Sequence, residues 1–212
     1  DVNGDGYDDV LVGVPNWDGG EIDEGRALLY CGGPAGPGFT PCWTWEPDEA
    51  GANAGAPAEP APGDVNGDGY ADLAVVAGGM DFALGDEGGV LVFLGSAAGP
   101  GSAPDWSWSC GEAGCTANRA GGAGDVNADG YSDLLVGGYD ADYGLDQQGR
   151  VQLFLGSASG LESTAAWTAL GGQVGARLGL ASLRGVGDVN ADGFGSPPTN
   201  PEFEALLRCS PL

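Results

Sequence analysis

The stretch DVNGDGYDD, which begins at Asp1, decides the fold of this chain because it returns three more times at almost constant spacing. The later copies are DVNGDGYAD from Asp64, DVNADGYSD from Asp125 and DVNADGFGS from Asp188. The intervals between their first residues are 63, 61 and 63 residues. A period of this length indicates that each repeat is a small supersecondary unit and not a single turn of a solenoid.

The nine-residue loop has the composition of a site for a hard cation. Positions one, three and five are Asp, Asn and Asp in all four copies, and carboxylate and amide oxygens suit Ca²⁺. Position six is always Gly, as a sharp reversal with positive φ requires. Position seven is aromatic, which suggests a main-chain carbonyl ligand with the ring packed outward, and position nine is Asp in the first three copies but Ser196 in the last. The candidate calcium ligands are Asp1, Asn3, Asp5, Tyr7 and Asp9; Asp64, Asn66, Asp68, Tyr70 and Asp72; Asp125, Asn127, Asp129, Tyr131 and Asp133; and Asp188, Asn190, Asp192 and Phe194.

Two alternatives to a β-type calcium loop need to be weighed. An EF-hand or dockerin-type loop requires a bidentate acid at position twelve, whereas that position holds Val12, Val75 and Val136 inside β-rich runs. The other alternative is an Asp/Asn/Gly turn that binds no metal. Because three carboxylates crowded into nine residues repel one another without a cation, we expect one Ca²⁺ in each of the three complete loops. For the fourth copy, both interpretations remain open.

Each repeat continues with the same landmarks, and these indicate an all-β fold. A short apolar strand follows the loop, then an acidic connector and a second strand (GRALLYCGG, GGVLVFLGS or GRVQLFLGS), a Gly/Pro/Ala turn and a Trp-bearing strand. A small-residue stretch leads into the next loop and is most strand-like at 176–183. Four strands in about 60 residues is the content of one β-propeller blade. We therefore expect about three and a half four-stranded blades that form an open or partial propeller, with repeats at 1–63, 64–124 and 125–187 and a divergent fourth repeat and tail at 188–212.

These residues resemble a known family. The DxNxDGxxD loop, a strand that ends near Val12–Pro15 and the GxVxLFLGSxxGL hairpin together resemble FG-GAP repeats, the blades of integrin α-subunit-like β-propellers and of related bacterial surface proteins. The resemblance extends to about Phe194 and implies an extracellular, secreted or cell-surface protein with a role in adhesion. It also implies that Ca²⁺ sits in the loop between the first two strands of a blade.

Composition excludes several classes of partner. The formal net charge is −25, with six Lys and Arg residues and no His, so nucleic acid and anionic membrane surfaces would be repelled. No apolar run approaches the roughly 20 residues of a membrane span. Because the sequence opens inside a metal loop and holds fewer blades than propellers usually need, we expect an arc of a larger protein. Further blades would come from a longer parent chain or from self-association.

The five cysteines do not recur at the repeat offsets, so they are not part of the blade plan. Cys31 and Cys42 flank one hairpin turn, Cys110 and Cys115 flank a short loop, and Cys209 is left over in the tail. Local disulfides suit an extracellular protein, and free buried thiols are the alternative. Zinc is a poor fit, because there is no His and there are no paired CxxC motifs.

Three functions can be compared at this point. Catalysis is disfavoured, since without His the usual Ser-His or Cys-His nucleophiles cannot form; a neighbouring enzyme domain is a separate alternative. A lectin could use aromatic rings that fall on equivalent strands, although packing between neighbouring blades is the favoured role for them: Trp43, Trp45, Trp106, Trp108 and Trp167. The leading hypothesis is a calcium-stabilised structural and adhesive module with a protein or glycan ligand that the sequence does not name.

Overall fold

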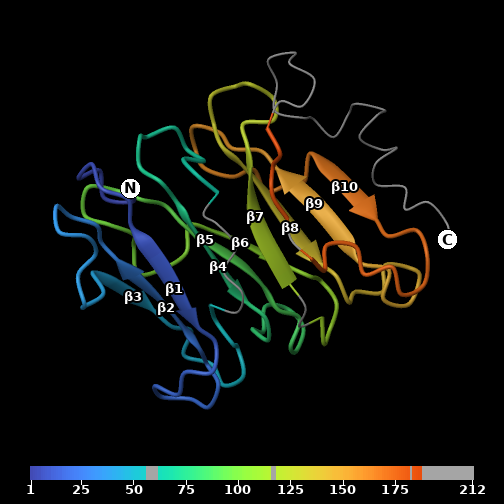
Figure 1. Cartoon of the computed structure of the whole chain (residues 1–212). Coiled ribbons are helices and arrows are strands. Elements are labelled where there is room, and N and C mark those ends of the chain that lie inside the picture. Colours follow the sequence, from blue (N-terminus) through green and yellow to red (C-terminus); the bar gives the residue numbers. More distant parts are fainter. Residues whose placement is uncertain (56–61, 116–117, 182, 188–212) are drawn as a thin grey trace.

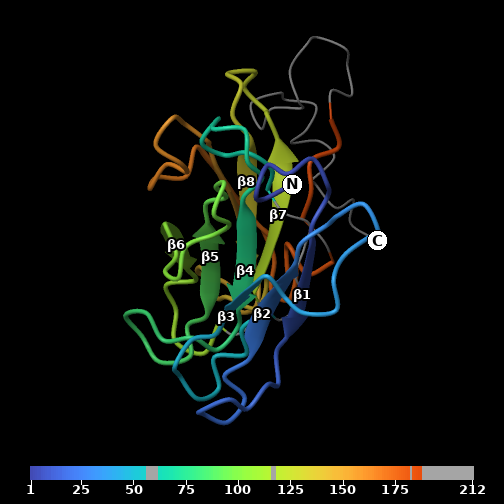
Figure 2. The same ribbon diagram turned by 90° about the vertical axis from the view of Figure 1, so that its left-hand side faces the viewer.

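The fold is three antiparallel sheets arranged side by side, and no helix occurs in the part of the chain that is described. The computed structural model describes residues 1–55, 62–115, 118–181 and 183–187. The sheets follow one another in chain order from the blue to the orange strands in Figure 1, and Figure 2 views them from the side of the first sheet. The strands are β1 (Val10–Val14), β2 (Arg26–Tyr30), β3 (Trp43–Trp45), β4 (Leu73–Ala77), β5 (Gly89–Phe93), β6 (Trp106–Ser109), β7 (Asn118–Gly124), β8 (Asp133–Gly138), β9 (Arg150–Phe154) and β10 (Trp167–Leu170).

The three sheets are built on one plan. Their orders are β1-β2-β3, β4-β5-β6 and β10-β9-β8-β7. Within each sheet, every strand therefore pairs with the strand that comes next in the sequence. The register is equivalent as well, because the valine at position twelve after each loop start lies opposite the middle of the second strand: Val12↔Leu28, Val75↔Leu91 and Val136↔Gln152. The sheets do not close on one another. The all-β, blade-type prediction is therefore confirmed, with an open arrangement consistent with a partial propeller.

The sheet and the sequence repeat are offset by one strand. β7 precedes the loop at Asp125, yet it pairs with β8, which follows that loop. In the second sheet, the chain before the loop at Asp64 forms only isolated bridges. Ala54 pairs with Ala77 of β4, and Gly63 pairs with Asp72, the residue just before β4. The third sheet thus begins before the repeat limit at 125. The limits 1–63, 64–124 and 125–187 stay a prediction for the blades, and 188–212 lies outside the described residues.

The strand expected at 176–183 is absent from the described part of that segment, which consists of turns and irregular chain. One main-chain hydrogen bond does connect the following residues to the third sheet, from Gly185 N–H to the Gly122 carbonyl at 2.8 Å. A strand that precedes a loop, as β7 does, pairs with the strand that follows the loop. In the earlier repeats that partner follows the loop, and here the equivalent residues are not among those described.

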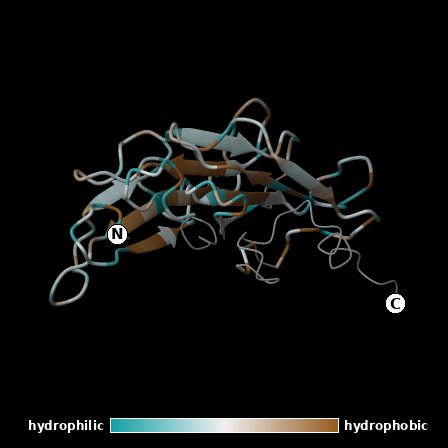
Figure 3. Ribbon diagram, turned by 90° about the horizontal axis from the view of Figure 1, so that it is seen from above, coloured by the Kyte–Doolittle hydropathy of each residue, from teal (hydrophilic) through white to brown (hydrophobic). Residues whose placement is uncertain are grey.

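The core lies between the sheets. Side chains alternate along a strand, so Leu73 and Val75 of β4 face the first sheet while Ala74 and Val76 face the third. Every residue of β4 and β5 is buried because both faces of the middle sheet are covered. Seen from above, strands coloured as hydrophobic run through the middle of the molecule and also reach the side near the N-terminus (Figure 3). This burial explains why these two strands read as continuous apolar runs.

Trp side chains fill the space between the sheets. Trp43 and Trp45 meet Phe93 of the next sheet, with ring centroids 5.1 and 5.2 Å apart. Trp106 meets Phe154 in the same way at 5.0 Å. The indole N–H of Trp43 also donates to the carbonyl of Gly101, in the loop between β5 and β6 of the next repeat, at 2.9 Å. These contacts support the packing interpretation of the Trp strand.

Two disulfides are present, as the local-disulfide interpretation predicts. Cys31–Cys42 closes the turn between β2 and β3, and Cys110–Cys115 closes the loop after β6. Cys209 lies outside the described residues. Within the described chain, no helix is long and apolar enough to cross a membrane.

Candidate metal-binding loops

The three complete loops share one geometry, in which the first Asp closes the loop on main-chain N–H groups. In the first loop, Oδ1 of Asp1 accepts hydrogen bonds from Gly4 N–H at 2.6 Å and Asp5 N–H at 3.1 Å, and Oδ2 accepts from Gly6 N–H at 2.8 Å. The second loop repeats all three bonds on Asp64. Gly6 has φ of 87°, a conformation that residues with a side chain rarely adopt.

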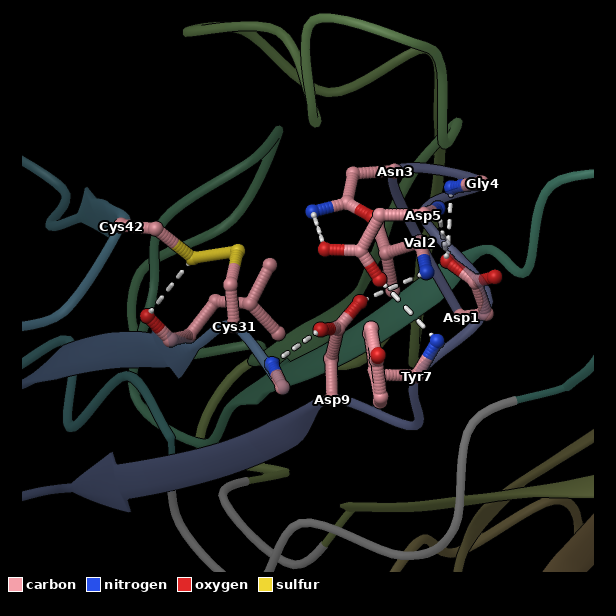
Figure 4. Close-up of a disulfide and its surroundings, with 11 residues drawn as sticks. Asp1, Val2, Asn3, Gly4, Asp5, Tyr7, Asp9, Cys31 and Cys42 are labelled. Atoms are coloured by element: carbon pink, nitrogen blue, oxygen red, sulfur yellow. Dashed lines mark hydrogen bonds between the residues drawn. A yellow bond between two sulfur atoms is a disulfide. The ribbon is translucent and has the colours of Figure 1, made fainter. Parts of the chain in front are cut away.

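Positions three and five hold each other across the mouth of the loop. Asn3 Nδ2 donates to Asp5 Oδ2 at 3.2 Å, and Asn3 Oδ1 accepts from Asp5 N–H at 3.0 Å. Asp5 Oδ1 accepts from Tyr7 N–H at 3.0 Å. Figure 4 shows the side chains of Asp1, Asn3, Asp5 and Asp9 grouped at this end of the first sheet. The same bonds recur at the residue pairs Asn66–Asp68 and Asn127–Asp129.

The Asp at position nine accepts hydrogen bonds from two separate segments of the main chain. Both carboxylate oxygens of Asp72 accept main-chain bonds, from Val65 N–H at 2.7 Å and from Gly95 N–H at 2.8 Å. Gly95 lies in the turn that follows β5, so the carboxylate fastens the loop to the second hairpin of its own sheet. Asp9 and Asp133 make the equivalent pairs of bonds. Sequence reasoning missed this anchor, although the recurring Gly after the second strand was a signal for it.

The charged forms of Asp72 and Asp133, at position nine of the second and third loops, are electrostatically unfavourable without a cation. Burial raises the pKa of the Asp72 carboxyl to about 6, and the nearby Asp64 and Asp68 carboxylates act in the same direction. The two main-chain N–H donors oppose this rise only in part. Burial raises the pKa of Asp133 as well, with Asp129 and Asp125 adding to the effect. A cation would relieve this repulsion.

The donor set fits calcium by its chemistry. Each loop brings three carboxylates, one amide oxygen and a main-chain carbonyl into nine residues, and hard oxygen ligands of this kind are those that Ca²⁺ prefers. No Arg neutralises them: within the described residues the one ion pair joins Arg177 to Asp140, away from the loops. The carboxylates accept hydrogen bonds from N–H groups of the loop, and in the described chain no three or more His, Cys, Asp or Glu side chains are arranged as they would be around a bound metal ion. The fourth set, Asp188, Asn190, Asp192 and Phe194, lies outside it.

Comparison with known proteins identifies the repeat. The family model for an FG-GAP-like repeat matches residues 1–75, and the model for an FG-GAP repeat matches residues 117–154. Both matches include a complete loop.

Among curated proteins, the chain is similar to subunits of integrins. It is 36% identical to integrin alpha-IIb of Mus musculus and 37% identical to integrin alpha-IIb of Homo sapiens, over 154 residues in each case. It is 36% identical to integrin alpha-PS2 of Drosophila melanogaster over 157 residues. These matches cover 66–67% of this chain but only 11–14% of the relatives, so the chain spans a small part of their length. The repeat models, the loop-bearing antiparallel sheets and these relatives agree, and the chain belongs to the FG-GAP repeat family, of the integrin α-like type.

Proposed function

We propose that the chain is a calcium-binding, non-catalytic part of an extracellular protein, and that its blades form a rigid scaffold for adhesion or for interaction with another protein. The observation that carries the proposal is the threefold repetition of one acidic loop, in which the first Asp accepts main-chain bonds from positions five and six in every copy, with no cationic partner within the described residues. Such repetition favours an architectural role over a single catalytic site.

Within this proposal, Asp1, Asn3, Asp5 and Asp9 would supply side-chain oxygens and Tyr7 a carbonyl oxygen to one Ca²⁺, and the equivalent residues would do so in the second and third loops. The bound ion would neutralise the crowded carboxylates and fix the loop at the head of its sheet. Extracellular modules typically bind Ca²⁺ with Kd of about 10⁻⁴ to 10⁻³ M, which suits sites that stay filled outside the cell.

The extracellular assignment is supported by two local disulfides, which persist in oxidising compartments. It is also supported by the integrin α relatives. A protein ligand is proposed over a glycan because four Trp side chains that a lectin would need are engaged between sheets or with neighbouring side chains.

Calcium titration by isothermal calorimetry, with Asp68→Asn as the test variant and Ala71→Ser as the control, tests the proposal. We expect Asp68→Asn to remove one binding site and Ala71→Ser to remove none, because position eight varies freely among the copies. Equal binding by both variants would contradict the assignment of the second loop.

A further inference from the structure

The first and the second candidate metal loops are each contacted by the repeat that follows them. The ring of Tyr70, at position seven of the second loop, lies against Gly4, at position four of the first loop. A Cβ atom added to Gly4 would lie 2.6 Å from Cε1 of Tyr70. The next pair repeats this contact, since a Cβ on Gly67 would lie 2.6 Å from Cε1 of Tyr131. Glycine at position four thus gives room to the aromatic ring of the following repeat.

Main-chain hydrogen bonds join the same segments. The Asp1 carbonyl accepts from Ala71 N–H at 2.9 Å, and the Val2 carbonyl accepts from Ser96 N–H at 3.1 Å. Between the second and third repeats, the Asp64 carbonyl accepts from Ser132 N–H at 2.8 Å and the Val65 carbonyl from Ser157 N–H at 3.0 Å. Both interfaces therefore use the first two carbonyls of one loop as acceptors for the following repeat.

One peptide group connects the acidic side of the loop to this interface. The peptide between Asp64 and Val65 donates its N–H to Asp72 Oδ2 at 2.7 Å and accepts, through its carbonyl, the N–H of Ser132 at 2.8 Å. The peptide between Asp1 and Val2 makes the same two bonds, to Asp9 Oδ2 and from Ala71. Its orientation is set on one side by a candidate ligand carboxylate and on the other by the next repeat. Hydrogen bonds in such a chain also polarise one another.

We propose that calcium occupancy of each loop is coupled to the docking of the following repeat, and not merely to the order of the loop's own repeat. This inference rests on the proposed function. An ion that fixes the carboxylates at positions one and nine also fixes the peptide group between positions one and two. That peptide group is the one whose carbonyl accepts a hydrogen bond from the next repeat. Because coupling is reciprocal, a docked repeat tightens calcium binding at the loop before it. The coupling runs from the first loop to the second repeat and from the second loop to the third.

Amide hydrogen exchange measured by NMR on the full chain in saturating calcium tests this direction. In Asp68→Asn, which weakens the second loop, we expect exchange at Ser132 and Ser157 of the third repeat to accelerate at least about fivefold, the lower end of typical coupling between sites. The Gly6 and Gly32 amides, which donate to Asp1 and Asp9 of the first loop, serve as the internal control, so their exchange stays unchanged. Asp5→Asn gives the mirror result, with acceleration at Ala71 and Ser96 only.

A steric variant tests the ring contact separately. Gly67→Ala directs a methyl group into the Tyr131 ring, and we expect weaker calcium binding at the second loop and faster exchange at Ser132. Strain alone does not explain such an effect, because Ala128 occupies position four of the third loop with φ of 58°. Ala128→Gly is the matched control and leaves exchange at Ser132 unchanged.

The outcomes separate this inference from the proposed function. If the wild-type chain binds calcium but Asp68→Asn accelerates exchange only at Gly67, Asp68 and Gly69, the coupling is wrong and the calcium function stands. If the wild-type chain binds no calcium, the function itself fails. Should Asp68→Asn not fold, exchange in the wild-type chain at rising calcium decides: protection at Ser132 that follows loop occupancy supports the coupling, and protection independent of calcium overturns it.

Discussion

The buried carboxylate of Asp72 accepts a hydrogen bond from the main-chain N–H of Gly95, 23 residues further along the chain, at 2.8 Å. Its other oxygen accepts from Val65 N–H. One side chain therefore ties the candidate metal loop, the start of β4 and the turn after β5 into one unit. This structural role exists without any ion, so it can be separated from calcium binding by experiment.

Removing that carboxylate destabilises the chain even in the presence of a chelator. Asp72→Ala leaves two buried main-chain N–H groups without a partner, at a cost of about 1–3 kcal/mol each. We expect the free energy of unfolding, measured with urea in EDTA, to fall by about 2–5 kcal/mol. Asp8→Ala, at the exposed position eight of the first loop, serves as the control, and an equal loss in both variants would count against the anchor.

Stability without calcium depends on pH in an unusual direction. The pKa of folded Asp72 is about 6, above its ordinary value of 3.8, so between these values the folded chain binds more protons than the unfolded chain. Asp72 therefore favours folding at low pH, and this contribution is lost as pH rises from about 4 to about 6. In EDTA we expect the Tm to decrease from about pH 5 to about pH 7, with a smaller decrease in Asp72→Asn. The same slope in both proteins would show that Asp72 is not responsible.

Trp106 is expected to stabilise the interface between the second and third sheets. Its ring meets Phe154, and its Nε1–H donates to the Glu162 carbonyl at 3.1 Å. Trp106→Ala should lower the free energy of unfolding by about 3 kcal/mol, whereas Phe39→Ala, which removes a fully exposed ring, should change it little. A Trp106→Ala protein with unchanged stability and lost glycan binding would favour a lectin instead.

The two disulfides should contribute unequally. They close segments with sequence separations of 11 and 5, which correspond to about 3 and about 2 kcal/mol in the chain-entropy model. We expect the Cys31→Ser/Cys42→Ser double variant to lose somewhat more stability to urea than Cys110→Ser/Cys115→Ser. The opposite order would show that packing of the Cys110 bridge outweighs loop closure.

Much of this architecture is predictable from the sequence because it depends on local patterns that repeat. The loops, the apolar strands and the Trp strands recur at fixed offsets, and the sheets and the inter-sheet position of Trp43 and Trp106 follow from them. The two local disulfides follow instead from pairs of Cys residues that flank a short turn or loop. The assignment of the loops as calcium sites stays a prediction.

What could not be predicted depends on contacts between distant segments. The loop motif itself gives no sign that Gly4, at position four, is contacted by Tyr70 from the next repeat. β7 was grouped with the repeat before it, although its hydrogen bonds join it to β8. Main-chain N–H and C=O groups are nearly the same in every residue type. A single sequence therefore does not show to which repeat these groups form hydrogen bonds.

Thermal unfolding of the full chain, with and without calcium, tests the central claim most directly. If calcium holds the three loops, the Tm rises as calcium increases through the range of about 10⁻⁴ to 10⁻³ M and returns to the metal-free value on addition of EDTA. A Tm that stays unchanged at saturating calcium would contradict the claim. Magnesium at the same concentration is the comparison, and the contradicting result is that neither ion changes the Tm.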